Sequence, residues 1–344
     1  MTTLLNTLYV TTQGSYLHLD NETVRIEVER QTVARVPLHH LGSIVCFGNV
    51  LISPQLLAKC AKEGRSVAYF DANGRFGCRV EGPVSGNILL RKAQCDAAAS
   101  AQDSLQISRN IVAGKIRNTR TFLRRAAREN GDEDDKVDLS NAADHLSAML
   151  KRLQRAKSID EVRGIEGEAA RKYFEQFSLM IKPSLREEFS FDGRNRRPPR
   201  DRINAMLSFV YTLLTHDAVS AIEGVGLDPR EGFLHVLRPG RPALGLDLVE
   251  EFRAMIADRL VVALINRRQI AHKDFEEYPG GAVLLNEKGR KKVLIAYQEK
   301  KRETIVHSLL KNKVEIGLLF HIQARILARA LRGDISEYMP MIFR

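Results

Sequence analysis

Glu166 is flanked by two glycines in the segment "RGIEGEAARKYF" at 163–174. The preceding "SIDE" at 158–161 fits a capping box with Ser158 as the N-cap, so we expect a helix that begins there and is interrupted at Gly164. After the interruption an apolar stripe runs through Ile165, Ala169, Tyr173, Phe177 and Met180. Glu166 lies beside this stripe, at the edge of the core, where a charge is costly unless it is paired or binds a metal.

The two glycines are themselves unusual in this helix. Gly164 and Gly167 each cost about 1 kcal/mol relative to alanine in a helix interior. Because glycine has no side chain, a nucleic-acid backbone or a partner helix could approach Glu166 closely. The alternative is that Glu166 is a first-turn glutamate favoured by the helix dipole.

A second group of chemically active residues follows at 235–250. Asp247 and Glu250, in "DLVEEFR", are three residues apart and share one helical face, which continues as small apolar residues and therefore points inward. Two inward carboxylates repel each other unless a cation lies between them. His235 follows the apolar pair "FL"; alone it would be interpreted as an ordinary core histidine, but the neighbouring acids make it a candidate ligand.

Together, Glu166, His235 and Glu250, with Asp247 nearby, would make an oxygen-rich site with one imidazole. Such a donor set suits Mg²⁺ or Mn²⁺ better than Zn²⁺, which prefers more nitrogen and sulfur. In a basic protein, a hard cation held by helices points to phosphodiester chemistry.

The sequence patterns around these residues predict an α+β fold with two domains. Residues 1–88 have period-two patterns and form a small β-rich domain. From residue 88 the apolar period is helical, so residues 89–344 are predicted to form a larger, all-α catalytic and DNA-binding domain. We expect strands at 8–10, 15–19, 23–28 and 32–36, buried strands in "GSIVCFG" and "SVAYFD", a helix at 54–64 and a tight turn at "DANG".

Three further segments complete the outline. The helix 202–222 has a polar line that is interpreted as structural hydrogen bonding or as support for a site, formed by Asn204, Ser208, Tyr211 and Thr215. The acidic segment 131–138 is predicted to be a surface loop. "FEEYPGG" at 275–281 is predicted to be a turn.

The formal net charge of +11 favours a polyanionic partner, most simply nucleic acid, although a merely basic soluble protein would have the same charge. Residues 105–129 hold seven Lys or Arg against one Glu, which is typical of a solvated helix face or of a phosphate-contacting helix. A basic loop at 193–202 and the segment 288–292 extend this charge. The arginines predicted to contact DNA are Arg117, Arg120, Arg124, Arg196, Arg197, Arg200 and Arg253.

The lack of a recognisable targeting signal and the spacing of the cysteines predict a cytoplasmic protein. The N-terminal "MTTLLNTLYV" lacks a basic region followed by a long apolar run, and the apolar stretch at 260–265 is too short to cross a bilayer. Cys46, Cys60, Cys78 and Cys95 show no close zinc-type spacing, so we expect reduced, mostly buried thiols.

Around Glu166, His235 and Glu250 the sequence resembles the Cas-one family, the CRISPR-associated endonuclease and integrase of spacer acquisition, with features similar to subtype I-C. The segments that carry the resemblance occur in the family order and cover roughly 160–260; they are "GIEGEAARKYF", "RPPRDRINAMLSFVYTLL", "GLDPREGFLH" and "LGLDLVEEFR". The resemblance implies an N-terminal β domain that forms a homodimer and a helical catalytic domain. It also implies a metal site made by Glu166, His235 and Glu250, with Asp247 in support.

The same resemblance implies the reaction and the partners. Two homodimers would flank a dimer of a small partner protein, the Cas-two protein. The complex would join the 3′ ends of a short double-stranded DNA fragment to the repeat of a CRISPR array, using Mg²⁺ or Mn²⁺. Two alternatives stay open at this point: a structure-specific nuclease in DNA repair, and a non-catalytic DNA-binding scaffold.

Overall fold

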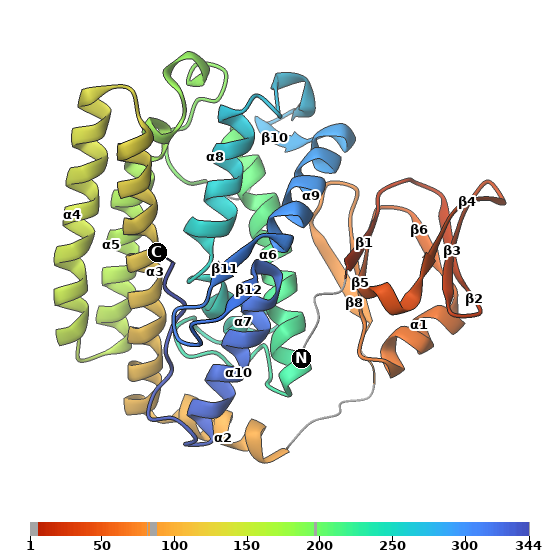
Figure 1. The fold of residues 1–344 in the computed structure, drawn as a ribbon, viewed down its shortest axis with the longest axis horizontal. Helices are drawn as coiled ribbons and strands as arrows, with labels where there is room; N and C mark the ends of the chain where they lie inside the picture. The colour runs from red at the N-terminus through yellow and green to blue at the C-terminus, as the bar shows by residue number, and fades with distance from the viewer. Residues whose placement is uncertain (1–5, 81, 83–87, 196–197, 344) are drawn as a thin grey trace.

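The computed structural model describes residues 6–80, 82, 88–195 and 198–343, and it has a β-rich N-terminal part followed by a largely helical part (Figure 1). The N-terminal elements are β1 (Asn6–Val10), β2 (Ser15–Asp20), β3 (Thr23–Val28), β4 (Gln31–Pro37), β5 (Leu41–Phe47), β6 (Val50–Ile52), α1 (Pro54–Lys62), β7 (Ser66–Phe70) and β8 (Phe76–Val80). Every strand predicted in this part is confirmed, as are the helix and the "DANG" turn before β8.

The N-terminal strands form two four-stranded sheets with orders β1-β5-β7-β8 and β4-β3-β2-β6. In the first sheet β1, β5 and β7 are parallel, so their connections must cross over, and α1 makes one of these crossings. The two sheets and α1 enclose a core of their own, which includes Leu17, Val24, Leu38, Ile44 and Leu56.

The first sheet also joins the β-rich part to the helical part. Phe47 of β5 and Phe70 of β7 belong to the core of the helical part, and the ring of Phe47 lies 6.0 Å from that of Phe209. A Cβ added to Gly74 would meet Phe209 at 2.5 Å, and its φ is +84°, so this turn requires glycine. The domain boundary predicted at 88 falls beside residues 83–87, which lie outside the described residues, and stays a prediction.

The helical part contains nine α-helices within the described ranges. They are α2 (Ile88–Ala99), α3 (Ala101–Glu129), α4 (Glu133–Arg155), α5 (Ile159–Glu175), α6 (Arg202–Val225), α7 (Ala243–Val249), α8 (Arg259–Asn266), α9 (Glu287–Arg302) and α10 (Leu319–Leu331). A π-helical segment, Arg253–Asp258, leads directly into α8. Helices α3, α4 and α5 lie together on the side of the molecule away from the sheets (Figure 1).

The prediction that this part is all-α is roughly consistent with the structure, which adds two small antiparallel sheets to the helices. These pair β9 (Phe275–Tyr278) with β10 (Ala282–Leu285) and β11 (Thr304–Val306) with β12 (Lys313–Glu315). The segment 275–281, predicted as a turn only, is therefore a strand followed by its hairpin turn. Val283 and Leu285 alternate inward on the second strand, which is the period-two signal that was overlooked.

Two other local predictions were wrong for reasons of helix chemistry. The acidic segment 131–138 is not a loop: Asp132 caps α4, and the acids that follow fill its first turn, where the helix dipole favours negative charge. Gly164 does not interrupt α5, which continues through it from Ile159 to Glu175.

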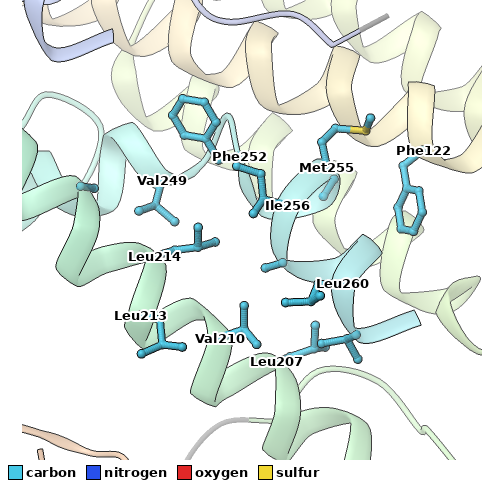
Figure 2. Packing of buried hydrophobic residues seen from close by; sticks show 14 of the residues in the cluster. Phe122, Leu207, Val210, Leu213, Leu214, Val249, Phe252, Met255, Ile256 and Leu260 are labelled. Carbon is cyan, nitrogen blue, oxygen red and sulfur yellow. The ribbon is translucent and has the colours of Figure 1, made fainter. Parts of the chain in front are cut away.

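Helix α6 is the central rod of the helical part. Its Leu207, Val210 and Leu214 face Ile256 and Leu260 in Figure 2, so the π-helical segment packs directly on it. Asp201 caps its first turn and Gly226 ends it at φ +94°. Among the described helices, α6 alone has the length and composition of a membrane span, but 67% of the relevant window is buried inside the protein, as in a core helix.

The thiols are only partly as expected. All four cysteines are free, but only Cys46 and Cys60 are buried, whereas Cys78 and Cys95 are exposed.

Candidate active site

Helix α5 carries Glu166 at the edge of the core, as predicted. Ser158 accepts a hydrogen bond from the Glu161 amide and fixes the start of the helix, while Ile165 and Tyr173 on the neighbouring stripe are buried. The Glu166 side chain is 26% exposed. A Cβ added to either flanking glycine would meet nothing within 4 Å, so the helix backbone on both sides of Glu166 is open to an approaching ligand.

Asp247, at the end of α7, is fully buried and anchors the segment that bears His235. Its carboxylate accepts hydrogen bonds from the amides of Phe233, Leu234 and His235 at 2.7–3.0 Å. It also lies 2.6 Å from Nδ1 of the His235 ring. Asp247 therefore orients the histidine rather than facing an open site.

The His235 ring stands between the two inward carboxylates. With Nδ1 held by Asp247, Nε2 faces Glu250 and lies 3.8 Å from Oε1 of that carboxylate. The sequence predicts a cation between Asp247 and Glu250, but the structure has the His235 imidazole there. The cations that contact Glu250 lie on its other side.

Those cations are Lys115 of α3 and Arg253 of the π-helical segment. Lys115 Nζ lies 2.7 Å from Glu250 Oε2 and also contacts the carboxylate of Glu166. Arg253 lies 3.0 Å from Glu250 Oε1 and stacks on Tyr211, 4.9 Å from its ring centroid. Lys115 thus joins two carboxylates that are far apart in the chain, next to His235.

The charges of this cluster follow from its neighbours. Burial by itself would raise the pKa of the Glu250 carboxyl, but Arg253, Lys115 and His235 outweigh it and lower the pKa to about 2. Burial opposes the charge of Lys115, yet Glu250 and Glu166 raise the pKa of its ammonium. The site consequently holds an ionised carboxylate and a protonated lysine near neutral pH.

Lys115 was missed at the sequence level, although a signal existed. It stands four residues after buried Ile111 and three before buried Asn118, so a lysine occupies the inward stripe of α3. A charge placed on an apolar face needs a partner, and the two glutamates supply it.

Residues 8–299 match the family model described as "CRISPR associated protein Cas1". The chain belongs to the Cas1 family. It is 54% identical over 341 residues to "CRISPR-associated endonuclease Cas1 1" of Moorella thermoacetica, with 99% of each chain covered. The protein of the same name from Chlorobaculum tepidum is 50% identical over 340 residues, again with 99% of both covered.

Solved structures agree with this assignment. A Cas1 protein from Thermotoga maritima superimposes with a TM-score of 0.82 at 25% identity, covering 96% of this chain and 97% of that one. A casposase bound to its integration product has a TM-score of 0.83 at 24% identity, covering 97% and 93%, and shares the fold. The resemblance to the family is thereby confirmed, whereas the subtype stays a prediction.

The polar line of α6 in this Cas1 chain forms hydrogen bonds with neighbouring elements, which fits both of its interpretations, and its support of the site stays a prediction. Tyr211 and Tyr173 both donate hydrogen bonds to the buried carboxylate of Asp258, which ends the π-helical segment. Asn204 and Ser208 accept hydrogen bonds from Arg194. A pocket beside the site is lined by these tyrosines together with Lys115, Thr119, Glu166, Arg253 and Asp258.

The predicted DNA-contacting arginines have different surroundings. Arg117 and Arg200 are exposed, and Arg124 is exposed but lies 2.7 Å from Asp144. Arg120 is half-buried, and Arg253 lies inside the site against Glu250. Arg196 and Arg197 lie outside the described residues. Contact of any of these arginines with DNA stays a prediction.

In the part of the chain that the structure describes, no three His, Cys, Asp or Glu side chains form a ready metal-ligand group. Between Glu166 and Glu250 the structure has the Lys115 ammonium, which contacts both carboxylates. The donor types nevertheless suit a hard divalent ion, since Glu166 and Glu250 both contact Lys115 and the Nε2 of the oriented imidazole lies 3.8 Å from Glu250. Glu250 Oε2 is buried, and it forms an ion pair with the Lys115 ammonium 2.7 Å away.

Proposed function

We propose that this chain is a metal-dependent DNA endonuclease and integrase that inserts short DNA fragments into a CRISPR array during spacer acquisition. The observation that supports this most is the cluster in which Lys115 joins Glu166 to Glu250 beside the Nε2 of His235. Membership of the Cas1 family supports the biological role.

The chain's own residues would prepare the site for phosphodiester transfer. Asp247 accepts a hydrogen bond from His235 Nδ1 and so directs Nε2 at the site, where it would bind a cation. Glu250 stays ionised because of its cationic neighbours. The open backbone around Glu166 would let a DNA strand reach these groups.

Mg²⁺ or Mn²⁺, held by Glu166, Glu250 and His235, would supply the remaining chemistry. Such an ion lowers the pKa of an attacking hydroxyl and neutralises charge on the phosphorane-like transition state. The 3′-hydroxyl of the DNA fragment would attack a repeat phosphodiester and form a new P–O bond, while the old P–O bond breaks and releases the 3′-hydroxyl of the repeat strand. A water molecule in the attacking position would give hydrolysis, and so nuclease activity.

Partners follow from charge and from relatives. The net charge of +11 supports binding to double-stranded DNA of the fragment and of the repeat. Solved relatives with the same fold include a complex described as Cas6-RT-Cas1–Cas2 and a Cas1–DNA complex. We therefore propose that this chain acts as a homodimer with DNA and a small Cas2 dimer.

The experiment is strand transfer with the partner protein and Mn²⁺ supplied. Glu166→Ala is expected to abolish strand transfer while DNA binding stays nearly unchanged, because the residue would hold the ion rather than the duplex. Glu168→Ala is the matched control, since Glu168 lies on the same helix and pairs with Arg152 instead. If Glu166→Ala lost both its fold and its DNA binding, the assignment would be contradicted.

Two other functions are distinguished by the same preparations. A non-catalytic scaffold would keep every activity in EDTA. A repair nuclease would turn over branched DNA faster than it produces integration or disintegration products.

A further inference from the structure

Lys115 is held where a divalent cation would have to bind. Its backbone is fixed, because a Cβ on neighbouring Gly114 would meet Pro340 at 2.6 Å and the Glu251 side chain at 3.3 Å. Helix α3 therefore cannot shift at this position without displacing its neighbours. Only 12% of the Lys115 side chain is exposed, and its ammonium contacts both Glu166 and Glu250.

A divalent ion at this site would need the same carboxylate oxygens that Lys115 contacts. Apart from Asp247, whose carboxylate is occupied by three amides and an imidazole, the cluster has two carboxylates, Glu166 and Glu250, and two cations, Lys115 and Arg253. A divalent ion placed between the carboxylates would repel an ammonium in contact with the same oxygens twice as strongly as a single positive charge would. The ion and the ammonium therefore compete for the same oxygens.

We propose that Lys115 is the resident counter-ion of the site, and that its ammonium must withdraw from Glu166 and Glu250 before a divalent cation binds. This inference rests on the proposed function. Lys115 also lines the adjoining pocket, so its flexible stem has space to move without motion of α3. A phosphate of bound DNA would then neutralise the displaced ammonium, which couples metal binding to DNA binding.

The test is Mn²⁺ affinity measured by titration calorimetry on the DNA-free protein. Lys115→Met keeps the length of the side chain and removes the competing charge, so it is expected to bind Mn²⁺ roughly ten-fold more tightly than the wild type. Lys151→Met, on the exposed face of α4, is the control for net charge and should bind like the wild type. Equal or weaker binding by Lys115→Met would overturn the proposal.

Coupling to DNA gives a second readout. A short duplex should strengthen Mn²⁺ binding to the wild type and should have little effect on Lys115→Met. Equal strengthening in both proteins would argue against withdrawal of the lysine.

Two further measurements separate this inference from the proposed function. If Lys115→Met does not fold, lysine acylation mapped by mass spectrometry on the wild type takes its place: Lys115 should become more reactive when Mn²⁺ is added, and unchanged reactivity would refute the exchange. Absence of Mn²⁺ binding in both the wild type and folded Lys115→Met would instead remove the metal site itself. Glu250→Gln in the Lys115→Met background should abolish binding and so locate the ion.

Discussion

At the scale of single residues, the site depends on what each carboxylate touches. Glu166 and Glu250 face a shared cation, whereas Asp247 is enclosed by amides and the His235 ring. A buried carboxylate that accepts three backbone hydrogen bonds is a structural anchor as well as a partner for the imidazole. Two acids on one helical face therefore have different roles.

Asp247→Asn tests this role. The substituted amide would present its NH₂ group to one of the donors that now face the carboxylate, so His235 would lose its fixed orientation. We expect strand transfer to fall about 10- to 100-fold, with a changed pH profile and unchanged DNA affinity. An activity equal to that of the wild type would show that the His235–Asp247 contact has no functional role.

At the scale of elements, α5 combines low helix propensity near Glu166 with an uncovered backbone at the same positions. Gly164 and Gly167 reduce helix stability, and no described residue packs into the space beside them. The π-helical segment has a comparable function, because it brings Arg253 to Glu250 and Asp258 to Tyr211 from one short stretch. Next to the site, α5 thus contains residues of low helix propensity and the segment 253–258 departs from α-helical geometry, as is common at functional positions.

Gly167→Ala separates stability from access. The new methyl group has space, so the free energy of unfolding should rise by up to about 1 kcal/mol. If DNA approaches the backbone here, strand transfer should fall although the protein is more stable. Chemical denaturation and strand-transfer rates on the same samples measure both effects, and unchanged rates would show that the opening is not used.

At the scale of the whole molecule, the segment 338–343 packs against the residues that follow Glu250. The segment 338–343 lies beside α3 (Figure 1), where the Phe343 amide donates a hydrogen bond to Asn118. Buried Glu251, next to Glu250, accepts hydrogen bonds from the Tyr338 hydroxyl, the Met341 amide and Gln323. Asn118 of α3 donates to the carbonyl oxygens of Glu251 and Met341. The last residues of the chain thereby fix the backbone from which Glu250 projects.

This arrangement predicts a pH-dependent stability. Burial raises the pKa of the Glu251 carboxyl to about 8, against the hydrogen bonds that lower it. The folded protein then binds a proton more tightly than the unfolded chain, so this contribution is present at low pH and is lost as the pH rises through the folded pKa. We expect the free energy of unfolding to fall by roughly 1.5 kcal/mol between pH 6.5 and 8.

Glu251→Gln provides the control, because glutamine does not titrate. Urea denaturation at several pH values should show a flatter slope in this variant, whatever its absolute stability. An equal slope in both proteins would assign the pH dependence to other groups.

The sequence by itself determined the local elements and the residue types of the site. Period-two patterns located six of the eight strands described before residue 81, a helical period marked the part after 88, and the motifs singled out Glu166, His235 and Glu250. These features depend on neighbours in the chain, which periodicity and capping report directly. Only the tertiary structure decided that Lys115 joins two of these residues, that Asp247 holds His235, and that the chain end anchors Glu251. The contacts of Lys115 and of Glu251 join segments far apart in the chain, and the His235–Asp247 contact joins a loop to α7. Local patterns carry no record of which side chains the tertiary packing brings together.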